Sequence, residues 1–259
     1  MNRLLSDAID AHGGFERWKQ FATIEVDLFS EGELLDRKGV QPSGMLRYTA
    51  QMHEQALSFT APAMGDKRFV FQPHRVAVET VGGQMIAERR DPRASFTGHD
   101  IDTPWDALQR GYFGCYAMWS YLTSPFSLAV EGAQVWDIDP LEDNGETWRG
   151  IRVVLPERFA THSRAQEFYF GDDRLLRRQD YTVDIASGFK VANYALDIVD
   201  VDGLKLPSKR RGYMCNKKYD VPGGKALMSL DMSNFRVNAQ QAAAKSATSI
   251  QFIQQAGDA

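Results

Sequence analysis

The sequence has few cysteines, no long apolar run and no excess of positive charge. Its two cysteines, Cys115 and Cys215, show no CxxC spacing and no histidine at ligand spacing, so we expect neither a disulfide framework nor a structural zinc site. The 30 Lys and Arg residues are outnumbered by 34 Asp and Glu residues, which gives a net charge of −4. A chain of this charge has no basic field to attract a phosphate backbone, and we expect no nucleic-acid partner.

The N-terminal segment lacks the apolar run of a targeting signal. Residues 1–10 (MNRLLSDAID) carry polar residues at close intervals, too close for a secretory signal or a membrane span. We therefore expect a cytoplasmic protein without a membrane span.

The local signatures of several enzyme classes are also missing. The sequence contains no GxGxxG, GxxxxGK[ST], HExxH or GxSxG motif, so dinucleotide binding, a P-loop, a zincin site and a serine-hydrolase elbow have no support. The closely spaced carboxylates Asp137 and Asp139, like Asp200 and Asp202, are too few for a calcium site. We expect no tightly bound metal and no cofactor.

The beginning of the chain has the pattern of a short amphipathic helix. Leu4, Leu5, Ala8 and Ile9 recur at helical spacing before the Gly13-Gly14 pair, which favours a helix end. Aromatic residues at 15, 18 and 21 follow at a spacing of three, enough for one further turn.

From Thr23 onward, apolar and polar residues alternate, which is the period-two pattern of strands with one face in solvent. Turn-forming pairs such as Asn144-Gly145 and Ser187-Gly188 separate the runs. The strands are expected at residues 23–28, 47–52, 56–61, 68–72, 75–80, 134–139, 147–155, 165–170, 175–185, 190–199, 205–212 and 227–237.

A central helix interrupts the strands. Thr103 provides a capping hydroxyl, Pro104 suits the first helical position and Asp106 suits the first turn, so the helix is predicted to start here and to run to Leu122, before Ser124-Pro125. Its apolar face is rich in aromatic residues. Gly111 and Gly114 lie inside it and indicate close approach by another part of the chain or by a ligand.

The connections between strands are too short for crossover helices, so the sheet is predicted to be mostly antiparallel. The fold class is therefore α+β, mostly β, with an N-terminal helix and a central helix. No linker divides the chain, so residues 1–237 are expected to form one domain. Residues 238–259, rich in Ala and Gln, are expected to form a polar tail.

The N-terminal segment at residues 11–18 (AHGGFERW), leading into a long antiparallel meander with one helix, resembles the LolA/LolB-like lipoprotein-carrier superfamily. Residues 116–122, 168–170, 177–181 and 206–211 are similar to those of a group of uncharacterised bacterial proteins with the same layout. The resemblance implies a strongly curved sheet that forms an incomplete barrel, whose helices close its mouth over an apolar cavity for acyl chains or similar ligands.

Aromatic residues of the central helix are the first candidates for ligand contacts. Tyr112, Tyr116, Trp119 and Tyr121 either line the cavity, with hydroxyl or indole groups toward a bound oxygen, or fill the core.

Two further candidates lie before this helix. His99 occupies a glycine-containing loop, where functional loops are common, or is a simple turn residue. Arg89, in a cluster of arginines, would bind an acidic head group or lie in a solvated loop.

The candidates for catalysis are His162, Tyr181, Asp180 and Arg178. His162 lies just before a strand, where an imidazole facing the cavity would serve as a general acid or base, and it is otherwise a surface or hydrogen-bonding histidine. Along residues 174–184, Asp180 and Arg178 point to one face and Tyr181 to the other. If Asp180 faces the cavity, Arg178 holds it ionised, whereas the ordinary expectation for so charged a run is a solvated edge strand.

Three functions remain open from the sequence. The first is binding of a hydrophobic small molecule or acyl chain in the cavity of the half-barrel. The second is a cofactor-independent lyase, cyclase or isomerase acting on an apolar or aromatic small molecule in the same cavity. The third is a scaffold whose exposed sheet edge recruits a partner strand. A closed apolar pocket would favour the first, and convergence of His162 with a tyrosine or carboxylate in it would favour the second.

Overall fold

The computed structural model describes residues 1–40, 44–143, 145–216, 218–221 and 223–239. Within these residues, 13 strands form one antiparallel sheet in the order β6-β5-β4-β3-β2-β1-β13-β12-β11-β10-β9-β8-β7. The strands are β1 (Phe21–Glu31), β2 (Leu46–Gln51), β3 (Leu57–Thr60), β4 (Lys67–Gln72), β5 (Arg75–Thr80), β6 (Met85–Arg90), β7 (Gln134–Asp143), β8 (Glu146–Val154), β9 (Ala165–Phe170), β10 (Leu176–Val183), β11 (Phe189–Val201), β12 (Leu204–Met214) and β13 (Met228–Ala239).

Few helices accompany this sheet. The α-helices are α1 (Arg3–Ala11), α2 (Gly14–Trp18), α3 (Glu33–Arg37) and α4 (Ala107–Thr123), and short 3-10 turns are η1 (Pro62–Met64), η2 (Pro92–Phe96), η3 (Phe126–Ala129) and η4 (Asp184–Ala186). None of the helices in the described part of the chain is long and apolar enough to cross a membrane.

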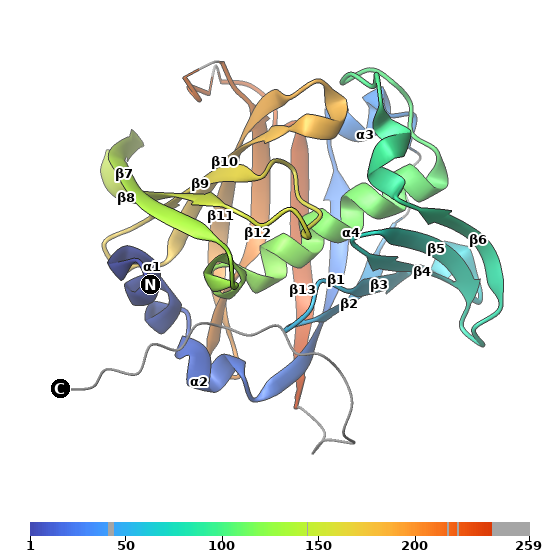
Figure 1. Cartoon of the computed structure of the whole chain (residues 1–259), viewed down its shortest axis with the longest axis horizontal. Helices are drawn as coiled ribbons and strands as arrows, with labels where there is room; N and C mark the ends of the chain where they lie inside the picture. The colour runs from blue at the N-terminus through green and yellow to red at the C-terminus, as the bar shows by residue number, and fades with distance from the viewer. Residues whose placement is uncertain (41–43, 144, 217, 222, 240–259) are drawn as a thin grey trace.

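The order of the strands leaves the sheet open between β6 and β7. Strands β1 to β6 follow one another outward in one direction, strands β7 to β13 return from the opposite edge, and the pairing of β1 with β13 joins the two halves. The segment from residue 91 to 133, which includes α4, connects the two edges. It crosses the concave side of the curved sheet, so that α4 occupies its interior (Figure 1). The expected α+β fold with one curved, incomplete antiparallel barrel is confirmed.

Helix α4 starts three residues later than the sequence predicts. Asp106 is the N-cap, and its side chain accepts from the backbone N–H of Gln109, whose side chain accepts in turn from the N–H of Asp106. Thr103 instead closes a turn with Asp100, and the backbone N–H of Trp105 donates to the carbonyl of Lys38. These contacts hold residues 103–105 outside the helix, so the predicted cap at Thr103 is wrong.

Of the remaining α-helices, α1 lies beside β8, whereas α2 and α3 lie at the two ends of strand β1 (Figure 1). Helix α1 buries the predicted face of Leu4, Leu5, Ala8 and Ile9, and it packs on β8 and η3. Helix α2 leads into β1 at one end, while α3 follows β1 and lies at the opposite end (Figure 1). The sequence analysis missed α3 and β6, which are short and offer little periodicity.

Strand β10 is an interior strand between β9 and β11, which corrects the expectation of a solvated edge strand. Tyr181 is buried on its inner face. Arg178 and Asp180 are buried on its outer face, where Arg178 also donates to Asp143 and to the carbonyl of Tyr219. Charged residues can therefore occupy this interior strand because Arg178 and Asp180 are paired with each other and covered by neighbouring side chains.

The predicted boundary between domain and tail falls within β13, which extends to Ala239. Residues 238 and 239 of the predicted tail therefore belong to the sheet. The rest of that tail, residues 240–259, lies outside the described residues.

The two glycines of α4 differ in their surroundings. A methyl carbon placed on Gly111 would lie 2.5 Å from Cδ1 of Phe69, whose ring is stacked on Phe59 at 4.7 Å between ring centroids. The nearest atom to a methyl carbon on Gly114 would be the Tyr48 hydroxyl oxygen, at 3.4 Å. Gly111 is therefore required by packing against the sheet, whereas Gly114 borders open space.

We expect Gly111→Ala to lower the free energy of unfolding by about 1–3 kcal/mol, because the added methyl group must displace the Phe69 ring. The matched variant Gly114→Ala should keep or raise stability by up to about 1 kcal/mol, through its higher helix propensity. Urea denaturation of the two variants measures the difference, and equal stabilities would contradict this account of Gly111.

Candidate functional site

An apolar pocket lies between α4 and the concave face of the sheet. It extends over about 920 Å³ including the solvent at its mouth, and the centre of a water molecule reaches about 90 Å³ of it. The smaller figure is enough for several water molecules. Aliphatic and aromatic side chains line most of it: Leu28, Leu34, Leu35, Val40, Leu46, Tyr48, Phe59, Trp105, Phe113, Ala117, Met118, Val183, Phe189, Val191, Leu227, Met228 and Leu230.

Small residues in two elements leave this space open. Gly114 and Ala117 face the pocket from α4, and Gly212 faces it from β12. Larger side chains at these positions would fill the volume between helix and sheet. The pocket is bordered at the α3 end of the half-barrel by residues from two segments. These are residues 34, 35 and 40, in and after α3, and residues 227 and 228, at the start of β13 and just before it.

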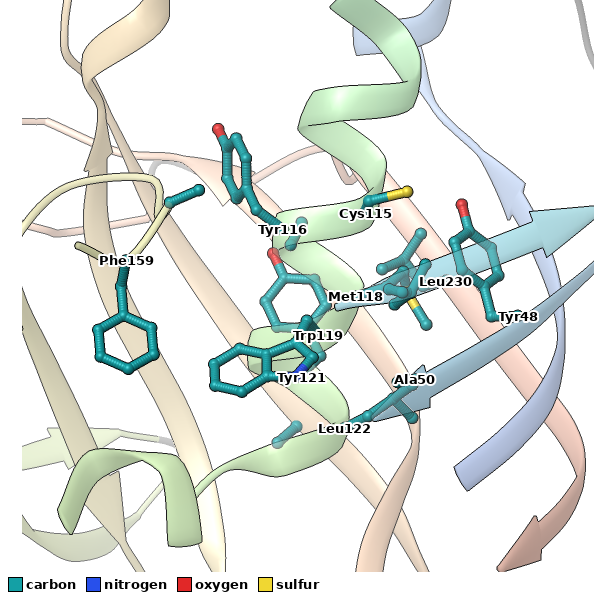
Figure 2. Packing of buried hydrophobic residues seen from close by; sticks show 14 of the residues in the cluster. Tyr48, Ala50, Cys115, Tyr116, Met118, Trp119, Tyr121, Leu122, Phe159 and Leu230 are labelled. Atoms are coloured by element: carbon teal, nitrogen blue, oxygen red, sulfur yellow. The ribbon is translucent and has the colours of Figure 1, made fainter. Parts of the chain in front are cut away.

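The side chains of α4 divide between the pocket and the packed core. Figure 2 shows Met118 directed toward Tyr48 and Leu230, which are pocket-lining residues. Trp119 extends to the other side of the helix, where its ring stacks on Phe159 at 5.8 Å between ring centroids (Figure 2). One face of the helix therefore borders the pocket while the opposite face packs.

Polar groups gather at one wall of this apolar pocket. Tyr121 of α4, Tyr181 of β10 and Asn193 of β11 all line it. The hydroxyl oxygens of Tyr121 and Tyr181 are 2.9 Å apart, and the Asn193 amide nitrogen donates to the Tyr121 hydroxyl at 3.4 Å. Burial raises the pKa of both tyrosines, so both hydroxyls are protonated at neutral pH.

His162 lies behind the two tyrosines. Its ring stacks on Tyr181 at 4.1 Å between ring centroids, and Nε2 lies 3.1 Å from the Tyr121 hydroxyl. Burial lowers the pKa of His162 to about 3, so the imidazole is neutral at pH 7. Nδ1 is buried without a hydrogen-bond partner among the described residues. A proton on Nε2 avoids a buried unpaired N–H, and we assign this tautomer.

The tautomer determines where the hydroxyl protons point. When Nε2–H of His162 and the Asn193 amide both donate to Tyr121, the Tyr121 proton is donated to Tyr181. The O–H of Tyr181 then remains as a donor, on a residue that borders the pocket.

Arg210 of β12 forms the next layer beneath this wall and is fully buried. Its Nη1 donates to Oε1 of Gln179 at 3.3 Å and to Oδ1 of Asn193 at 3.2 Å. Its Nη2 donates to the Tyr121 carbonyl at 3.4 Å, and the guanidinium lies 4.5 Å from the Tyr121 ring centroid. Burial lowers the pKa of Arg210 to about 10, which leaves it charged at neutral pH.

Two of the four predicted catalytic residues are not at this wall. Asp180 and Arg178 form a bidentate pair, at 2.7 and 2.9 Å, on the face of β10 opposite to Tyr181. Burial raises the pKa of Asp180 to about 6, and the contacts with Arg178 oppose this rise, so the carboxylate is ionised at neutral pH. Because adjacent strand residues point to opposite faces, Asp180 and Tyr181 cannot act on one bound molecule.

The other predicted ligand contacts fall outside the pocket, except Tyr121. Tyr112, Tyr116 and Trp119 are buried in the core, and Trp119 donates to the carbonyls at 51 and 54, both at 2.8 Å. Arg89 forms a bidentate ion pair with the helix cap Asp106, at 3.1 and 2.8 Å. His99 packs edge-on against Phe96 at 5.6 Å between ring centroids.

Asn193 and Arg210 were not among the site residues predicted from the sequence. The alternation of side chains along the strands contained a signal for both residues. In β12, Arg210 is an even number of residues from the buried Leu204 and Leu206 and so faces the same side. In β11, Asn193 likewise faces the same side as the buried Val191 and Ala195. Parity places them on the inner face despite their polarity.

We expect His162 to make stability depend on pH. An unfolded histidine binds a proton near pH 6.5, whereas folded His162 does so only near pH 3, so the folded state loses stability as pH falls below about 6.5. Between pH 7.5 and pH 5 this loss amounts to about 2 kcal/mol from His162. His162→Gln should reduce the acid-induced loss by that amount in denaturant titrations at the two pH values. The exposed His74→Gln is the control, and an unchanged loss in His162→Gln would contradict the assignment.

Of the comparisons with known proteins, the one with solved structures bears on the fold. A scan against models of protein families finds no match, and a search of curated proteins finds none. Among solved structures, a LolA superfamily protein from Nitrosomonas europaea matches over 92% of this chain and 93% of that chain, with a TM-score of 0.50 and 9% identity. A DUF1329 family protein from Desulfovibrio piger matches over 92% and 93%, with a TM-score of 0.49 and 12% identity. The chain therefore has a LolA-like fold, as the resemblance of its N-terminal segment and meander predicted.

Proposed function

We propose that the chain binds a hydrophobic small molecule or acyl chain in the pocket between α4 and the sheet. The observation that carries the proposal is the pocket itself, which is lined mainly by aliphatic and aromatic side chains and has a few polar groups at one wall. This is the usual composition of small-molecule sites, in which apolar surface supplies affinity and polar groups fix orientation. The LolA-like fold supports the proposal, since an apolar cavity is what the resemblance implies.

The energetics of such a site favour a flexible apolar ligand. Each CH₂ group that leaves water contributes about 0.8 kcal/mol, so each added methylene raises affinity about fourfold until the enclosed space is filled. Met118 and Met228 line the pocket and adapt readily to ligands of different shape.

The arrangement gives less support to a lyase, cyclase or isomerase. Among the described residues lining the pocket, the titratable ones are Tyr48, Arg110, Tyr121 and Tyr181. Burial raises the pKa of all three tyrosines, and burial lowers that of Arg110. His162 is not among the residues that line the pocket and it is neutral, so none of these groups is poised to exchange a proton near neutral pH.

A neutral apolar dye tests the proposal directly. Nile red should bind with a blue-shifted emission, and Val191→Phe should weaken its binding about tenfold or more, because the larger ring occupies the pocket. The control is Leu196→Phe in the same strand, at a position that is 40% exposed and does not line the pocket.

Two outcomes would contradict the proposal. One is wild-type protein that binds no Nile red and releases no apolar molecule on organic extraction and mass spectrometry. The other is equal dye affinity in the wild type and in a folded Val191→Phe variant, which would place the dye elsewhere.

A further inference from the structure

The buried arginine at the polar wall has no counter-ion among the residues that the structure describes. Arg210 is 0% exposed, and no carboxylate of the described residues forms an ion pair with it. An uncompensated buried charge costs several kcal/mol, and a guanidinium cannot avoid this cost by losing its proton at neutral pH. The position therefore carries an unmatched positive charge inside the protein.

The neutral groups around Arg210 satisfy it poorly. Its hydrogen bonds to Gln179, Asn193 and the Tyr121 carbonyl measure 3.2–3.4 Å, whereas charge-assisted bonds are about 2.7–2.9 Å. Its Nε is buried and has no hydrogen-bond partner among the described residues. The carbonyl of Tyr121 lies in the last turn of α4, so the helix dipole supplies only a partial negative charge.

Arg178 shows how the same chain treats a buried arginine with a structural role. Its guanidinium contacts the carboxylates of Asp180 at 2.7 and 2.9 Å and of Asp143 at 3.1 Å. It also donates to the carbonyl of Tyr219 at 2.6 Å. Arg178 is thus fully paired, and Arg210 differs from it by the absence of a negatively charged partner.

Arg210 is connected to the pocket through the residues that it contacts. Asn193 and Tyr121 both accept hydrogen bonds from Arg210 and both line the pocket. The Asn193 carboxamide turns its oxygen toward the guanidinium and its nitrogen toward the Tyr121 hydroxyl. A negative charge placed at this wall would lie one side chain away from Arg210, with Tyr181 O–H as a direct donor.

We propose that the wall formed by Tyr121, Tyr181 and Asn193 binds the carboxylate head of an amphiphilic ligand, with Arg210 as its counter-charge. This inference rests on the proposed function and specifies the chemical class of the ligand, a long-chain carboxylic acid. The small number of hydrogen-bond donors at this wall suits a single carboxylate. A phosphate ester carries up to two negative charges, whereas the hydrogen bonds of the wall lead to the single charge of Arg210; the second arginine at this pocket, Arg110, lines it from α4.

A pair of probes with the same alkyl chain tests the inference. Dodecanoate should bind the wild-type protein about tenfold to a hundredfold more tightly than dodecanol, the difference expected for hydrogen bonds to a charged group, measured by displacement of Nile red. Arg210→Met should remove this preference, so that the variant binds dodecanoate no more tightly than dodecanol. The control Arg211→Met changes the neighbouring residue, which pairs with Asp231, and should keep the preference.

A second variant is designed to fold even if Arg210→Met does not. Asn193→Asp keeps the shape of the side chain and supplies a carboxylate where Oδ1 already lies 3.2 Å from Arg210. It should raise the melting temperature and abolish the preference for dodecanoate, because the counter-charge is then internal.

The outcomes separate the two proposals. Equal affinity of the wild type for dodecanoate and dodecanol would overturn the carboxylate inference and leave apolar binding intact. A preference that survives in Asn193→Asp or in Arg210→Met would overturn the role of Arg210, and tighter binding of dodecyl phosphate than of dodecanoate would overturn the choice of carboxylate. Failure of Nile red and both probes to bind would overturn the proposed function and the inference with it.

Discussion

The interior of this protein depends on one constraint: an antiparallel sheet that is open between β6 and β7 must have its concave face covered by the segment that joins these two edges. Helix α4 is that cover. Its packed side brings Trp119 and Tyr116 into the core, and its small residues Gly114 and Ala117 leave space on the other side. The pocket therefore exists because the side chains of a single helix do not fill all of the space above the concave face of the sheet.

The two buried arginines, Arg178 and Arg210, lie on opposite faces of the sheet and have different hydrogen-bond partners. The ion pair of Arg178 with Asp180 lies on the outer face of β10, away from the pocket, and it is satisfied by close contacts. Arg210 lies on the inner side and has only neutral acceptors. The two buried arginines therefore differ in their partners: Arg178 is paired with carboxylates, whereas Arg210 has neutral acceptors, which compensate less of the cost of burying its charge.

Much of the fold could be predicted from local patterns, and less of the site. The N-terminal helix, the central helix and most strands follow from helical or alternating spacing, which short sequence windows contain. The start of α4 at Asp106 rather than Thr103 depends on a backbone contact with Lys38, which is distant in sequence. The alternation in residues 177–181 correctly placed Asp180 and Tyr181 on opposite faces of the sheet, but it did not determine which of the two faces lines the concave interior. Tyr121 and Tyr181 lie at the pocket with His162 behind them, while Arg210 was missed because an arginine is expected to be exposed.

The way in which the two halves of the sheet meet also governs how the chain must assemble. Every ladder except one joins strands that are consecutive along the chain, and the exception pairs Ile24 with Val237. Most of the conformational entropy lost in closing long loops is therefore lost when β1 pairs with β13. The strands β1–β6 and the strands β7–β13 form through contacts between strands that are consecutive in the sequence. Arg210 and its hydrogen-bond partners lie on α4, β10, β11 and β12, so this wall is built from segments that lie between the two meeting strands in the sequence.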